Sequence, residues 1–185
     1  MNPIYEHKPN GGIGYGFEEF LNHFFEICYE HLRDGRARAF AFILFDFEHG
    51  DVFKTMKDRS VFTKLDRISG KDLTIFYLNS NDTYLINNFN QIFGYALGGY
   101  EEIQRPAIVF FKVVSNDAED IKYHQISNNK LFAFQEINDS VKDYITRLNK
   151  KTSKHPDFLK DIFKRIGEAG FDYIVERFFD KLTRG

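Results

Sequence analysis

The feature that most constrains the fold is the apolar run AFAFILFDF at residues 39–47. A strand with one solvated face alternates apolar and polar residues, whereas a strand covered on both faces is apolar almost throughout. Two further runs of this kind follow, DLTIFYL at residues 72–78 and PAIVFFKVV at residues 106–114. The sequence therefore predicts an α/β fold, in which helices cover both faces of a central sheet.

Helical periodicity fills the segments around these strands. Apolar residues recur there at steps of three and four, which places them on one face of a helix. The stripe of the first helix includes Cys28, so we expect this residue in the core rather than exposed as a nucleophile. The predicted helices cover residues 17–32, 51–68, 83–97 and 134–149.

The helix at residues 51–68 is expected to be kinked near Ser60, a candidate cap for a second helical section that begins at Val61. Asp51 stands at the start of this helix. A carboxylate in that position accepts free backbone N–H groups and complements the helix dipole, so we expect Asp51 to act as the cap.

The connections determine how the strands pair. Two strands joined by a helix should be parallel, which applies to residues 39–47 and 72–78. Pro106 heads the third strand, at a position where the missing N–H costs least. A tight turn then leads to IKYHQI at residues 121–126, whose alternation predicts an antiparallel partner at the edge of the sheet. The order is a helix, then β-α-β-α-β-β-α, with a mixed four-stranded sheet.

The length of 185 residues suits a single domain with a core that needs no disulfide. We expect a flexible N-terminal arm at residues 1–16, a main domain with its preceding helix at 17–150, and a helical hairpin at 151–185. The apolar stripes of the hairpin must be buried, either on the protein's own core or against a partner or second copy. The candidate partner interface is Phe171, Ile174, Phe178 and Phe179.

Charge and cysteine content limit the possible functions. The net charge is −2, with −6 over residues 1–141 and +4 over residues 142–185, where 11 Lys and Arg face 7 Asp and Glu. This balance argues against nucleic-acid binding. The single cysteine excludes an internal disulfide and fits a reducing compartment. No apolar run approaches the roughly 18–20 residues of a membrane span, so we expect a cytoplasmic protein.

The βαβ unit followed by a ββα unit resembles the thioredoxin-like fold over residues 39–149, with FILFDF as its first central strand and Arg105-Pro106 before PAIVFF. The resemblance implies that the Arg105-Pro106 peptide bond is cis and that the backbone before it pairs with a bound substrate. Redox-active members carry cysteine after the first strand, where this chain has EHGDVFK. Thiol–disulfide exchange requires a thiolate, so the resemblance implies a redox-inactive relative.

The hypothesis from the sequence is a non-catalytic module for protein interaction, a subunit or accessory component of a larger system, with no cofactor. Loops at the carboxyl ends of parallel strands are where α/β sheets bind ligands. The candidate binding groove is therefore formed by Glu48, His49, Asp51, Arg105 and Pro106.

Two alternatives stay open. Asp46, Glu48, His49 and Asp51 carry side chains that ligate zinc or manganese, so a metal-dependent enzyme is the second hypothesis. No HExxH motif or second ligand cluster accompanies them, and no GxSxG nucleophile elbow is present. A homodimer through residues 156–182 is the third hypothesis.

Overall fold

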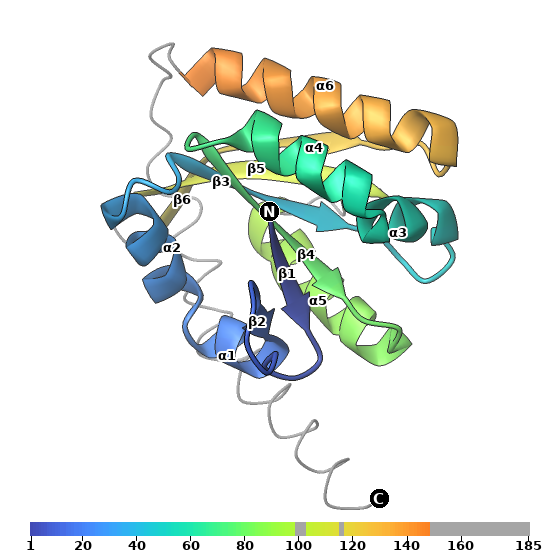
Figure 1. Ribbon diagram of the computed structural model, residues 1–185, viewed down its shortest axis with the longest axis horizontal. Helices are drawn as coiled ribbons and strands as arrows, with labels where there is room; N and C mark the ends of the chain where they lie inside the picture. Colours follow the sequence, from blue (N-terminus) through green and yellow to red (C-terminus); the bar gives the residue numbers. More distant parts are fainter. Residues whose placement is uncertain (99–102, 115–116, 149–185) are drawn as a thin grey trace, which may run out of the picture.

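The computed structural model describes residues 1–98, 103–114 and 117–148 (Figure 1). The predicted hairpin at 151–185, with Phe171, Ile174, Phe178 and Phe179, lies outside the described residues. The strands are β1 (Asn2–Tyr5), β2 (Tyr15–Gly16), β3 (Ala39–Leu44), β4 (Leu73–Asn79), β5 (Ala107–Val114) and β6 (Asp117–Gln125). The helices are α1 (Phe17–Asn22), α2 (Phe24–Arg33), α3 (Gly50–Lys57), α4 (Arg59–Ser69), α5 (Thr83–Gly98) and α6 (Lys130–Leu148).

The strands form one mixed sheet in the order β2-β1-β4-β3-β5-β6. All residues of β3 are buried, and this strand pairs in parallel with β4 on one side and antiparallel with β5 on the other. β5 and β6 form the antiparallel hairpin that the tight turn predicted. The α/β class and these pairings are confirmed. The expected four strands were too few, because the described part of the sheet has six.

The two additional strands come from the N-terminal segment. β1 pairs in parallel with β4, and its Ile4, opposite Leu78, is fully buried. Residues 1–16 were expected to be a flexible arm, but β1 and β2 within this range are strands of the sheet. Gly14 adopts a φ of +127°, and a Cβ there would lie 2.6 Å from the Pro3 carbonyl oxygen. A four-residue run that contains proline has little local strand preference, so its pairing depends on the edge that β4 offers.

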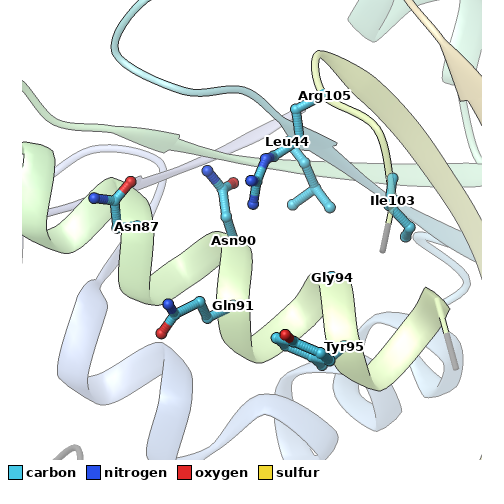
Figure 2. Close-up of a pocket in the computed structure, with 8 residues that line it drawn as sticks. All are labelled: Leu44, Asn87, Asn90, Gln91, Gly94, Tyr95, Ile103 and Arg105. Carbon is cyan, nitrogen blue, oxygen red and sulfur yellow. The ribbon is translucent and has the colours of Figure 1, made fainter. Parts of the chain in front are cut away.

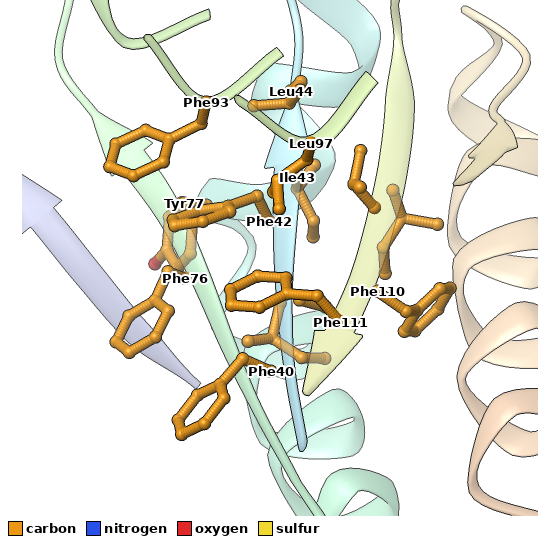
Figure 3. Packing of buried hydrophobic residues seen from close by; sticks show 14 of the residues in the cluster. Phe40, Phe42, Ile43, Leu44, Phe76, Tyr77, Phe93, Leu97, Phe110 and Phe111 are labelled. Carbon is orange, nitrogen blue, oxygen red and sulfur yellow. The ribbon is translucent and has the colours of Figure 1, made fainter. Parts of the chain in front are cut away.

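Helices cover both faces of the sheet, with α1, α2 and α5 on one face and α3, α4 and α6 on the other (Figure 1). On the first face, the Phe42 ring of β3 packs on Phe93 of α5 (Figure 3), with the ring centroids 4.2 Å apart. The Phe42 ring also lies 5.7 Å from Phe24 of α2, centroid to centroid. On the second face, Phe110 stacks on Tyr144 of α6 at 4.5 Å. Aromatic packing of this kind joins the layers into one core.

Two of the predicted helices are interrupted. The helix expected at residues 17–32 is divided at His23 into α1 and α2. The kink expected near Ser60 is a break at Asp58, whose carboxylate accepts hydrogen bonds from the N–H groups of Ser60 (2.8 Å) and Val61 (3.4 Å). Asp58 is therefore the cap instead of Ser60, because it stands at the position whose side chain reaches the first free N–H groups.

The buried face of α2 carries the thiol of Cys28 and the imidazole of His31. Cys28 is fully buried, as predicted, and burial raises the pKa of its thiol. His31 is 2% exposed; its Nε2 lies 2.8 Å from the Tyr15 hydroxyl oxygen and its Nδ1 lies 3.1 Å from Thr74 Oγ1. Burial lowers the pKa of His31 to about 4. The neutral ring thereby links α2 to β2 and β4.

None of the helices in the described ranges combines the length and the apolar character that crossing a bilayer demands.

The pKa of His31 leads to a prediction about stability in acid. The unfolded chain binds a proton at this ring near pH 6.5, whereas the folded protein resists it until about pH 4. The contribution of the neutral His31 ring to the free energy of unfolding is therefore fully present above pH 6.5. It is lost as the pH falls, and the loss reaches about 3 kcal/mol at pH 4. Urea unfolding at pH 7 and pH 4.5 should show a smaller loss for His31→Gln, which stays neutral, than for the unaltered chain. Equal losses would contradict the prediction.

Candidate functional site

The candidate site lies where β3 ends and β5 begins. These strands are antiparallel neighbours, and Leu44 at the end of β3 pairs with Ala107 at the start of β5. The Arg105-Pro106 peptide bond is cis, as the resemblance implied. This pairing brings the loop after β3, which starts at Phe45, beside Arg105, although the two are far apart in the sequence.

Asp46 links three elements through its carboxylate. Its Oδ2 lies 3.0 Å from Arg105 Nε, and its Oδ1 accepts a hydrogen bond of 2.9 Å from the side-chain amide of Asn90 on α5. The same amide of Asn90 donates to the Phe45 carbonyl oxygen at 2.9 Å. Asn90 is only 2% exposed, whereas the side chains of Arg105 and Asp46 are 24% and 30% exposed, so the network runs from the core to the surface. Charge-assisted hydrogen bonds of this kind hold the loop after β3 in one position.

His49 closes the same loop. Its backbone N–H donates to the Asp46 carbonyl oxygen at 2.9 Å, and its Nδ1 accepts from the Asp46 N–H at 3.0 Å. The neutral ring therefore carries its proton on Nε2. Nδ1 also lies 4.0 Å from Asp46 Oδ2, which is too long for a hydrogen bond, so the backbone contact sets the ring position. Nδ1 is thus used for structure and not for chemistry.

The other predicted groove residues have different surroundings. Asp51 is the second residue of α3, which has no side-chain cap, and its carboxylate lies 3.9 Å from Lys54 Nζ. The expected capping role of Asp51 was wrong because the residue lies inside the helix instead of before it. Glu48 is exposed, and Pro106 is buried at the start of β5. The structure thus brings Asp46, His49 and Arg105 together and leaves Glu48 and Asp51 at the surface.

Sequence reasoning missed Asn90 and a cavity beside it. The cavity has a volume of about 120 Å³ and lies between α5 and the strand ends (Figure 2). A polar residue at helical spacing from buried Ile86, Phe93 and Leu97 was the signal that could have identified Asn90. The lining residues are Leu44, Asn87, Asn90, Gln91, Gly94, Tyr95, Ile103 and Arg105.

Large apolar side chains are exposed next to the loop. Phe47 is 62% exposed, and Leu131 and Phe132 at the start of α6 are 81% and 54% exposed. The Asn128 side-chain amide lies 3.5 Å from the Glu48 carbonyl oxygen, which brings the start of α6 to this loop. We call Phe47, Leu131 and Phe132 the Phe47 corner.

The arrangement does not form a metal-binding group. Within the described ranges, no three His, Cys, Asp or Glu side chains are placed so that they could hold one ion. Asp46 and His49 instead bond to neighbouring groups of the protein.

No protein-family model, curated protein or solved structure is significantly similar to this chain.

The network around Asp46 leads to a prediction about stability. Asp46→Ala removes the acceptor that Arg105 and Asn90 share, and we expect the free energy of unfolding to fall by about 1–3 kcal/mol. Glu48→Ala, two residues away and exposed, is the control and should change it by less than about 0.5 kcal/mol. Urea titration of both variants measures the difference, and equal effects would contradict the role of Asp46.

The metal alternative has its own test. A metal that binds only the folded state raises the unfolding temperature. If the protein binds no metal, Zn²⁺, Mn²⁺ and EDTA should each shift the midpoint of thermal unfolding by less than about 1 °C. Stoichiometric metal in the purified protein, or a stabilisation that Asp46→Ala abolishes, would favour the enzyme hypothesis.

Proposed function

We propose that this chain is a redox-inactive thioredoxin-like module that binds another protein, as a subunit or accessory component of a larger system. A βαβ unit (β3, α3–α4, β4) and a ββα unit (β5, β6, α6) share one sheet, in the order β4-β3-β5-β6. This arrangement supports the thioredoxin-like part of the proposal. Fold alone does not imply function, so the interaction role rests on the site.

The chemistry near the sheet end supports a non-catalytic role. The loop between β3 and α3 contains no cysteine, and Cys28 is fully buried on α2. Asp46 and His49, the residues best suited to acid–base work, are bonded within the loop network. The engagement of both Asp46 carboxylate oxygens and of His49 Nδ1 within the protein supports a structural role for these groups.

The observation that carries the proposal is the Phe47 corner. Its members come from two segments that the contact between Asn128 and the Glu48 carbonyl oxygen joins, and exposed apolar patches mark protein interaction sites. Aromatic residues often supply most of the binding energy at such sites. The Asp46 network holds the loop that presents Phe47, so little ordering is required when a partner binds. Arg105 and His49, two residues of the binding groove predicted from the sequence, belong to the network around Asp46.

The proposed compartment is the cytoplasm, because a single buried cysteine fits a reducing environment. The proposed partner is a protein and not a nucleic acid, because the net charge of −2 supplies no general attraction to phosphate.

Affinity capture with matched baits tests the proposal. The baits are the unaltered chain, Phe47→Asp, and Ile13→Asp as a control at an equally exposed apolar residue (66%) outside the Phe47 corner. Lysate from cells that naturally make the protein is passed over each bait, and retained proteins are quantified by mass spectrometry. We expect a set that the unaltered and Ile13→Asp baits retain and that Phe47→Asp loses at least about tenfold, since buried charge opposes binding. Equal retention by all three folded baits would refute the proposal.

A further inference from the structure

Helix α5 has an exposed face without charge. Its 16 residues include no acidic or basic side chain, although 28% of the whole chain is charged. Phe89 and Phe93 pack on Phe42 in the core, whereas Asn87, Gln91 and Tyr95 are exposed at intervals of four residues. A solvated helix face normally carries charges. Depletion of charge together with an exposed tyrosine is typical of the centre of a protein interface.

The chemistry of this face is self-complementary. At a two-fold axis a surface meets its own copy, so any charge there would face a like charge. A carboxamide carries both a donor and an acceptor and can therefore pair with its own copy. Gln91 has this property and is the middle residue of the exposed stripe Asn87, Gln91 and Tyr95. Asn87, one turn before it, has the same property.

The same patch also contains a projection and a cavity. Tyr95 is 62% exposed, and beside it lies the cavity of about 120 Å³ with Leu44 and Ile103 among its walls (Figure 2). Gly94 leaves this space open, since a Cβ there would first meet the Leu44 side chain at 3.9 Å. Arg105, the charged lining residue, is paired with Asp46 at 3.0 Å. A two-fold interface brings the same patch of both copies together, so a projection and a cavity on one patch can each meet the other on the second copy.

We propose that α5 is the two-fold interface of a homodimer, in which the two helices pack antiparallel across Gln91. Tyr95 of each protomer then lies against Asn87 and the cavity of the other, because residues 87 and 95 are equally distant from the axis at Gln91. The stripe from 87 to 95 is about 12 Å long, two turns of helix on each protomer. This interface shares no residue with the Phe47 corner or with the candidate dimer segment at residues 156–182.

Sedimentation equilibrium of the full chain, from low micromolar to sub-millimolar concentration, tests the proposal. We expect the unaltered chain to dimerise. Gln91→Lys and Gln91→Glu should each raise the dimer dissociation constant by more than about tenfold, because like charges meet at the axis. An equimolar mixture of the two variants should restore dimers, since opposite charges then meet. Gln125→Lys adds the same charge at an exposed glutamine of β6 and should behave as the unaltered chain.

Lys and Glu are good helix formers, and residue 91 is exposed, so both Gln91 variants should keep the thermal midpoint of the unaltered chain. Tyr95→Ala, which adds no charge, provides a second test and should also weaken the dimer. An unaltered chain that stays monomeric throughout would overturn the proposal. A dimer that these variants leave intact, or folded monomeric variants that do not associate when mixed, would overturn it equally.

Discussion

The burial of β3 on both faces and both edges is the constraint on which the rest of the structure depends. Its backbone groups bond to β4 on one side and to β5 on the other, and all its side chains are buried. Such a strand is stable only if helices cover each face, since exposed apolar area would cost about 25 cal/mol per Å². The aromatic contacts of Phe42 with α2 and α5 on one face, and the packing of α3, α4 and α6 on the other, meet this requirement.

The same pairing decides what the candidate site can do. Since β3 ends where β5 begins, Asp46 lies between Arg105 and Asn90 and its carboxylate is bonded to both. His49 uses Nδ1 to accept a backbone hydrogen bond. Residue types that suggest a metal or acid–base site therefore stabilise a loop. The loop in turn presents Phe47 to solvent, and this exposed ring is the feature on which the proposed binding surface rests.

The Phe47 corner and the exposed face of α5 differ in chemistry. The corner is apolar and irregular, which suits a partner with its own apolar side chains. The α5 face is a regular stripe of carboxamides and tyrosine, which suits its own copy. The two proposals rest on separate residues, so a dimer would present two Phe47 corners, and either proposal can fail without the other.

Local periodicity in the sequence was sufficient to predict the α/β class, the parallel β3–β4 pair, the β5–β6 hairpin and the burial of Cys28. Periodicity encodes which faces of an element are buried, and connection length limits how neighbours pair. Only the tertiary structure decided the β1–β4 pairing, the environment of His31 and the bonding of Asp46 to Asn90 and Arg105. Each of these joins residues far apart in the chain, and a hydrogen bond or strand pairing between them forms only after the fold has set their distance and orientation.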